Sequence, residues 1–201
     1  NSVRLLIAVV SLMFFWIVSE GMPTVLAAPW RLGLTVGGIG FGFGSLLLLV
    51  GQKMSDPVTP AIVAAMMPIA GASIELVLDK RKFHLQLVGG IVLTMVGGLL
   101  ATGLRFSNGK FGLGALLCLL AIFLFAWATR KTTRDFQTLS SLGQTTITLV
   151  GSLIITLLAH GSFLLLSFGE TEIGNMDYKH IMILLIFSLP VIAIAQLLWI
   201  W

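Results

Sequence analysis

The side chains best suited to chemistry are two carboxylates beside a basic turn. Glu75 stands one helical turn before Asp79, so on a helix both carboxylates share one face. A charge held within hydrocarbon usually serves a function such as ion or solute contact, whereas a charge at the end of a span is simply hydrated. Because Glu75 lies close to the end of an apolar run, both interpretations stay open, with hydration as the default.

The remaining reactive side chains form no catalytic or metal-binding pattern. His84, His160 and His180 lack metal-ligand spacing, and no nucleophile occurs in a recognisable catalytic motif. Cys118 is the single cysteine and lies in an apolar run, so we expect a small buried hydrophobe without a disulfide partner in the chain. The lack of such patterns argues against an intramembrane enzyme. The sequence therefore predicts no metal and no other cofactor.

The composition is that of an integral membrane protein. Of 201 residues, 57% are hydrophobic and only 10% are charged, whereas soluble domains have about 25% charged residues. The strand alternation of a membrane barrel is absent, so we expect an all-α protein whose spans bond their backbone groups internally. The net charge of +4 comes from loop ends rather than from one basic face, which argues against nucleic acid as a partner.

Apolar runs of about 20 residues, the length that crosses a bilayer as a helix, divide the chain. We expect seven spans, at residues 3–19, 32–51, 57–78, 85–104, 111–129, within 144–168, and 181–201. Pro68 should bend the third span because it removes a helical amide. The sixth span either ends near His160, which places the imidazole at the interface, or continues to Phe168, which places it in the membrane; we favour the first.

Basic residues orient the spans. The turn at residues 79–84 contains Lys80, Arg81 and Lys82, and the excess of basic residues in cytoplasmic loops places this turn inside the cell. A second basic cluster follows two spans later and should lie on the same side: Arg130, Lys131 and Arg134. The N-terminus is then outside and the C-terminus inside.

The second span is rich in glycine. In a regular helix one stripe contains Gly33, Gly37, Gly40, Gly44 and Gly51, with Gly38 and Gly42 beside it. Such a face lets another helix approach closely in lipid. A phosphate-binding loop would need a preceding strand, which the sequence does not offer, so the sequence predicts a packing face.

Two weak matches between the halves of the chain indicate an inverted repeat. Residues 4–12 can be aligned with residues 144–152, and residues 42–50 with residues 193–201. The paired spans have opposite predicted orientations, as in transporters that are built from inverted repeats.

The chain resembles the EamA-type family of the drug/metabolite transporter superfamily. The resemblance is most specific between Gly38 and Gly98, where a glycine-rich span, a short polar turn and a helix with a central proline follow one another. It continues at Ala126-Trp127-Ala128, which is similar to the start of the family's second repeat. The remaining matching positions are Pro68, Asp79-Lys80-Arg81, Gln86, Gly89, Gly97 and Arg130-Lys131.

The resemblance implies a fold of ten spans in two inverted five-helix repeats. This chain would cover spans two to eight, with residues 1–104 as the first repeat without its first helix. Residues 105–201 would be the start of the second repeat, without its last two helices. The implied function is a secondary transporter that exports small metabolites, amino acids or drugs by alternating access across a bacterial-type cytoplasmic (inner) membrane. Its implied partners are a small-molecule solute and membrane lipids, in a monomer or a homo-oligomer.

The resemblance also implies which residues line a solute cavity. It points to Trp127 and to the surroundings of Ser45, Pro68 and Gln196, while an interfacial anchor is the alternative role of Trp127. Trp199 lies one turn from Gln196, and an aromatic wall beside an amide suits an amphipathic solute. The candidate cavity residues, including the carboxylate discussed above, are Ser45, Pro68, Glu75, Trp127, Gln196 and Trp199.

The alternatives are a seven-span membrane receptor or a membrane subunit without transport activity. A retinal protein would need a lysine in its last span, and residues 181–201 contain none. The internal repeat also argues against a receptor, so a transporter is the preferred function.

Overall fold

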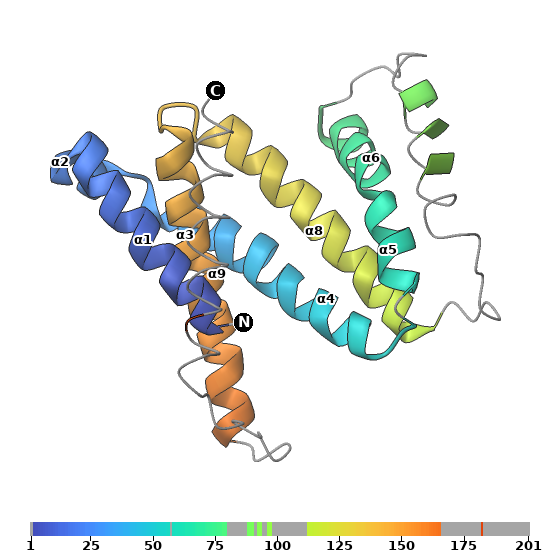
Figure 1. Ribbon diagram of the computed structural model, residues 1–201. Coiled ribbons are helices and arrows are strands. Elements are labelled where there is room, and N and C mark those ends of the chain that lie inside the picture. The colour runs from blue at the N-terminus through green and yellow to red at the C-terminus, as the bar shows by residue number, and fades with distance from the viewer. Residues whose placement is uncertain are drawn as a thin grey trace. The chain divides into compact units, whose positions relative to one another are not determined.

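The computed structural model describes residues 2–56, 58–79, 88–90, 92–93, 96–97, 112–165 and 182, and the elements in this part of the chain are helices (Figure 1). The named elements are α1 (Ser2–Glu20), α2 (Met22–Ala27), α3 (Trp30–Thr35), the π-helix η1 (Val36–Phe43), α4 (Gly44–Lys53), α5 (Val58–Ala65), α6 (Met67–Asp79), α8 (Leu113–Asp135) and α9 (Ser141–Leu165).

Several of these helices are long and apolar enough to cross a membrane. Within the described ranges, four helices meet this condition: Ser2–Glu20, Trp30–Lys53, Leu113–Asp135 and Ser141–Ser162. The bent pair Thr59–Ala65 and Met67–Leu78 would make a fifth. The all-helical membrane architecture is therefore confirmed. The predicted spans at residues 85–104 and 181–201 fall outside the described residues except for isolated positions, and the number seven stays a prediction.

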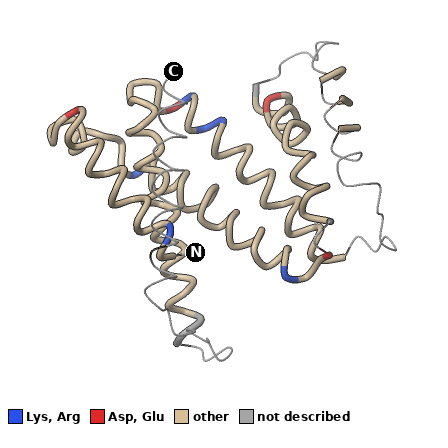
Figure 2. The backbone as a smooth tube through the Cα atoms, viewed as in Figure 1, with Lys and Arg blue, Asp and Glu red and all other residues tan. Residues whose placement is uncertain are grey.

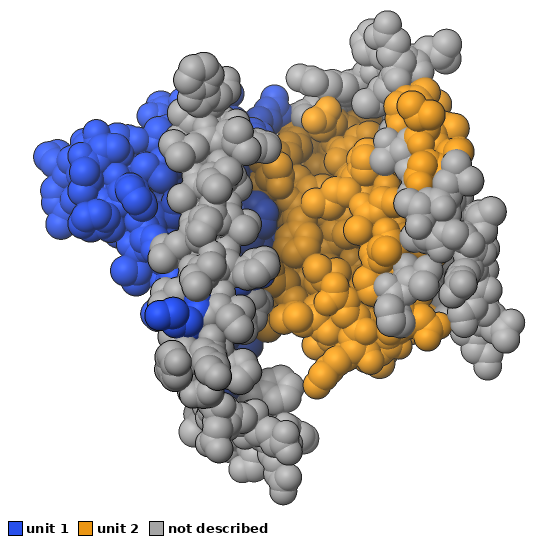
Figure 3. All heavy atoms as spheres, viewed as in Figure 1, with its two compact units in different colours: residues 1–42, 132–201 blue, residues 43–131 orange. Residues whose placement is uncertain are grey.

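The chain forms two compact units (Figure 3). Unit 1 contains Asn1–Gly42 and Thr132–Trp201, and unit 2 contains Phe43–Lys131. Both unit boundaries fall inside helices, one at the end of η1 and one near the end of α8. The predicted repeat boundary at residues 104 and 105 lies outside the described residues, so the division into repeats remains a prediction.

Unit 1 is built around α9. Helices α1 and α9 run side by side in opposite directions (Figure 1), and α3 also packs on α9. One end of the unit has an aromatic and aliphatic core in which Trp16, Phe136 and Ile147 have no exposed surface. The short helix α2 joins this core through Val25. The apolar side chains at this end therefore bring α1, α2 and the α8–α9 turn together.

Unit 2 consists of α4, α5, α6 and most of α8. Its core contains Val63 of α5, Ala70 of α6, and Cys118, Ile122 and Ala126 of α8. The C-terminal end of α6 lies at one end of the unit, and the turn between α4 and α5 lies at the other (Figure 1). Basic residues occur at the ends of both α4 and α8 (Figure 2). The predicted basic turn at residues 80–84 lies outside the described residues, so its placement on the same side as the second basic cluster stays a prediction.

Pro68 bends the third predicted span, as expected. Helices α5 and α6 meet at Met66 with an angle of 44° between the paired segments. The amides of Ile69 and Ala70 both donate to the Met66 carbonyl oxygen, at 2.9 and 3.0 Å. Pro68 has no amide hydrogen for the Ala64 carbonyl. The missing donor explains why the regular hydrogen-bond ladder breaks here rather than elsewhere in the span.

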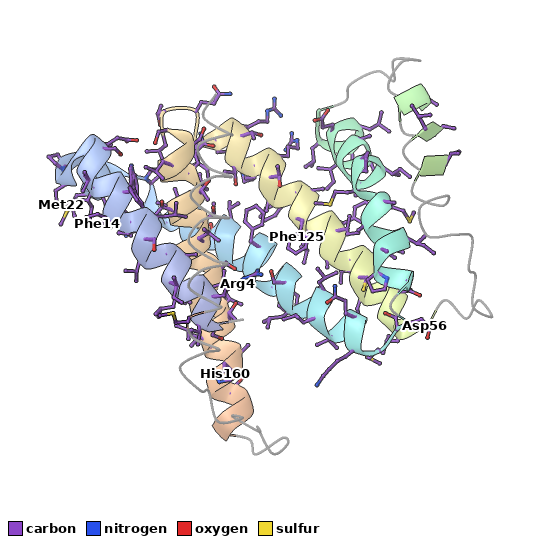
Figure 4. The ribbon with its side chains drawn as sticks, in the orientation of Figure 1. Arg4, Phe14, Met22, Asp56, Phe125 and His160 are labelled. Carbon is purple, nitrogen blue, oxygen red and sulfur yellow. The ribbon has the colours of Figure 1, made fainter. Side chains whose placement is uncertain are left out.

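Helix α9 extends further than the sequence interpretation favoured. It continues to Leu165, and the candidate span within it ends at Ser162. His160 is therefore in the last turn of that span, near the lower end of α9 in Figure 4, and its side chain is exposed. The helix runs past His160 instead of ending at it, because a single glycine, Gly161, is tolerated within a helix and the apolar run continues beyond it to Leu165.

The glycines of the second predicted span do not form one stripe, which corrects the expectation of a single packing face. Gly33, Gly37, Gly38 and Gly42 face α9, whereas Gly44 and Gly51 face α8. The reason is the π-helix η1, whose hydrogen bonds run from residue i to i+5 instead of i+4. Each turn then holds more residues, so the residues that follow are rotated about the helix axis relative to an α-helical continuation.

The close packing of Gly37 on α9 predicts that a larger residue at this position lowers the stability of the protein. A Cβ atom added to Gly37 would overlap with the backbone oxygen of Thr148, which cannot move without displacing α9. We expect Gly37→Ala to lower the free energy of unfolding by about 1–3 kcal/mol, the usual cost of overpacking. The measurement is unfolding in mixed detergent micelles, followed by far-ultraviolet circular dichroism.

Gly71→Ala is the matched control, because an added Cβ there meets no atom within 4 Å. Alanine loses less backbone entropy than glycine on folding, so this variant should gain about 0.5–1 kcal/mol. Equal stability of the two variants would show that the contact between η1 and α9 is not as tight as described.

Candidate functional site

Four of the predicted cavity residues lie in unit 2. Ser45 is on α4, Pro68 and Glu75 are on α6, and Trp127 is on α8. Gln196 and Trp199 lie outside the described residues. The structure therefore brings four of the six candidates into one compact unit.

The side chains of these four residues are at the surface of unit 2, not in its core. Pro68 and Glu75 are exposed, and Ser45 and Trp127 are half-buried. The core position next to Trp127 on α8 is instead filled by Ala126. Within the described part of the chain, no hydrogen bond joins Ser45, Pro68 and Trp127 to one another. Their common feature is that each side chain is at least partly exposed.

One line of residues on α5 and α6 has an unusual surface. Ala61, Ala64, Pro68 and Glu75 are exposed, and Gly71 between them is half-buried with open space beside it. These positions recur at three- or four-residue intervals, so they follow one side of the bent helix pair. The line contains small side chains, the break at Met66 and one carboxylate. We call it the α5–α6 small-residue line.

Helix α1 shows a different kind of exposed surface. Val10, Phe14 and Val18 are 62%, 64% and 68% exposed, and Phe14 lies on the outer side of α1 in Figure 4. Bulky apolar side chains of this kind suit contact with lipid chains. The small-residue line instead offers little hydrocarbon contact and places a charge among small residues, which is typical of a surface facing water, a solute or another helix.

The turn between α8 and α9 is fixed by a glutamine. The side-chain amide of Gln144 donates to the carbonyl oxygens of Phe136 and Leu139, at 2.8 and 3.0 Å. Ser140 caps the start of α9 by accepting a hydrogen bond from the Gly143 amide, at 3.1 Å. These bonds satisfy carbonyls and amides that the two helix ends leave without partners. The turn is therefore held by its own side chains.

Two tryptophans close the same end of unit 1. The rings of Trp16 and Trp30 lie 6.2 Å apart, and the indole of Trp16 donates to the Glu20 carboxylate at 3.1 Å. The indole of Trp30 donates to the Val25 carbonyl at 2.8 Å. Gly143 packs on Trp16, because a Cβ added there would be 2.9 Å from the indole ring. Sequence reasoning missed this cluster, although tryptophan close to the end of a span is a usable signal.

Helix α9 carries a row of buried hydroxyl groups that the sequence interpretation also missed. The hydroxyls of Thr146, Thr148 and Thr156 donate to the carbonyl four residues earlier in α9, at 2.7 to 2.9 Å. Such bonds satisfy polar groups inside a span. Ser152 is 2% exposed, and its hydroxyl makes no hydrogen bond with the described residues. The four-residue spacing from Thr148 to Thr156 was the available signal.

Metal ligands do not cluster in the described ranges. No group of three or more His, Cys, Asp or Glu side chains there could hold a metal ion. Cys118 is buried in the core of unit 2.

The long apolar helices, the proline-broken helix pair and the glycine-based packing define a multi-pass helical membrane protein. The model of the EamA-like transporter family matches residues 1–103, which is just over half of the chain. The protein belongs to this family, as its sequence motifs predicted. No curated protein and no solved structure matches the chain.

The Gln144 bonds give a prediction for stability. Gln144→Ala removes both donors and leaves the Phe136 and Leu139 carbonyls without this partner, so the free energy of unfolding should fall by about 1–3 kcal/mol. Thr145→Ala is the control, because the Thr145 hydroxyl bonds only to Ser141 in its own helix. Denaturant titration of the purified protein in micelles measures the free energy of unfolding of both variants. Equal losses would show that the glutamine does not fix the turn.

Proposed function

We propose that this protein is a secondary transporter that exports small metabolites, amino acids or drugs across a bacterial-type cytoplasmic membrane by alternating access. Its membership of a transporter family supports the reaction class. The observation that carries the proposal is the α5–α6 small-residue line, which combines a broken helix with an exposed carboxylate. Broken helices and charges inside spans are typical of solute and ion sites in transporters.

The candidate residues have complementary chemical roles in this proposal. Glu75 would hold a cationic group of the solute or a proton, and the Ser45 hydroxyl would donate or accept a hydrogen bond. Trp127 would provide an aromatic wall for the apolar part of the solute. Gln196 and Trp199 would add an amide and a second aromatic ring. The proposed solute is thus small and amphipathic, with at least one polar group.

The inverted repeat is part of the same proposal. The opposite directions of α1 and α9 support pairing residues 4–12 with residues 144–152. Residues 1–104 would then belong to the first five-helix repeat and residues 105–201 to the second. The two repeats would move against each other around the solute, while membrane lipids cover the bulky apolar faces. Whether the protein works as a monomer or a homo-oligomer does not affect this scheme.

Transport by reconstituted protein tests the proposal. Proteoliposomes are loaded with labelled amino acids or with the cationic dye ethidium, and the initial rate of release is compared with that of empty liposomes. For a released solute, Glu75→Gln, Trp127→Ala and Gln196→Ala should each reduce the rate by roughly tenfold, the effect of losing about 1.4 kcal/mol of binding.

Leu116→Ala is the control for side-chain removal on the same helix as Trp127. Leu116 is 61% exposed and lies outside the candidate site, so its variant should release solute at the original rate. Wild-type protein that releases none of the solutes would count against the transport function. Unchanged rates in all three site variants would remove these residues from the solute path.

A further inference from the structure

Helix α2 is the short connection between α1 and α3 in unit 1. Helix α1 has 19 residues, so it is about 28 Å long and ends close to where a hydrocarbon layer of about 30 Å ends. Gly21 follows with a φ of 84°, a left-handed angle that glycine adopts at no steric cost and that turns the chain out of the α1 axis. Helix α2 therefore lies at one face of the membrane, where the chain passes from one candidate span to the next.

The exposed side of α2 is apolar. Met22 and Leu26 are four residues apart and are 55% and 75% exposed, so they share one side of this single helical turn. Thr24 is the one polar residue of α2, and its hydroxyl donates to the Glu20 carbonyl oxygen at 2.9 Å. Residues 21–30 contain no charged side chain. The surface of this connection therefore offers hydrocarbon rather than hydrogen-bonding groups.

The neighbouring turn of unit 1 has the opposite character. The α8–α9 turn and α2 contribute Phe136 and Val25 to the same core. The exposed side chains of the turn are nevertheless polar, at Gln137, Thr138 and Ser140. Polar residues are usual in a connection that faces water, and exposed bulky apolar residues are not. The two connections share a core, so the difference in their exposed residues indicates that α2 does not face water.

The apolar surface of α2 continues the apolar surface of α1. Helix α2 packs against α1, and Phe14 and Met22 lie on the same outer side of these two helices in Figure 4. Exposed bulky residues recur at four-residue intervals from one helix to the other, at Val10, Phe14, Val18, Met22 and Leu26. The surface that suits lipid chains on α1 thus extends without a polar break onto α2.

We propose that α2 is an interfacial helix that binds the membrane surface. Met22 and Leu26 insert among the phospholipid acyl chains just below the head groups, at the depth of about 5–10 Å that interfacial helices reach. Trp30 fixes α2 at this level, because its indole donates to the Val25 carbonyl oxygen at 2.8 Å and indoles favour the membrane interface. This contact goes beyond transport and holds whichever solute the protein moves, so its test needs no substrate.

The test measures which reagents reach a spin label on α2. Labels are attached to Met22→Cys or Leu26→Cys in a Cys118→Ala background, and the protein is reconstituted in vesicles of phosphatidylethanolamine and phosphatidylglycerol. Power-saturation electron paramagnetic resonance compares collisions with oxygen, which concentrates in hydrocarbon, and with a nickel chelate, which stays in water. Phe14→Cys is the reference on the outer side of α1, and Gln137→Cys is the reference on the polar turn.

The proposal predicts a ratio of oxygen to nickel collisions at both α2 positions that is several-fold higher than at Gln137→Cys and approaches that at Phe14→Cys. A ratio as low as at Gln137→Cys would place α2 in water and overturn the proposal. Few collisions with either reagent would show that protein covers α2, for example a second copy of the chain, and would overturn it too. If the Cys118→Ala background fails to fold, Cys118 is kept, because its side chain has no exposed surface to label.

Discussion

The structure of unit 1 depends on the contact between the backbone of η1 and the backbone of α9. Lipid chains are as apolar as the side chains they surround, so helices in a membrane associate through close van der Waals packing and hydrogen bonds. Gly37 meets the Thr148 carbonyl, and Gly151 in turn leaves room for the backbone of Leu34 and Gly38. With α3 and η1 held on one side of α9, α1 packs along α9 as well, and the tryptophan cluster closes one end.

The helices of unit 2 also pack closely through small residues, and one pair of them is a broken helix. Gly51 and Gly114 bring α4 and α8 together, and small residues at Ala70 and Ala126 let α6 approach α8. The α5–α6 small-residue line lies outside this packing and carries Glu75, next to exposed bulky side chains such as Val77. Pro68 then opens the hydrogen-bond ladder on the same surface. The chemistry proposed for transport is thus a consequence of how the helices pack.

The sequence predicted most of the fold and only part of the site. Apolar run lengths predicted the spans that the structure describes, and proline chemistry predicted the bend at Pro68, because both depend only on the residue types along a short stretch of chain. The π-helix was not predictable from hydrophobic periodicity, since a change of hydrogen-bond partner leaves the residue types unchanged, and the expected single glycine stripe was wrong for that reason. The grouping of Ser45, Glu75 and Trp127 in one unit was found only in the structure. Their contact with a solute remains a prediction.

The contact between Gly51 and Gly114 limits which substitutions evolution can accept at these two positions. On each side the neighbouring atom is a backbone oxygen, that of Gly114 for Gly51 and that of Gly51 for Gly114. A larger residue at either position therefore cannot be accommodated by shortening a side chain alone, because the backbone oxygens would remain even if the Cys118 sulfur beside Gly51 were removed. Genetic suppressors of such a substitution would have to arise elsewhere, in residues that move a whole helix.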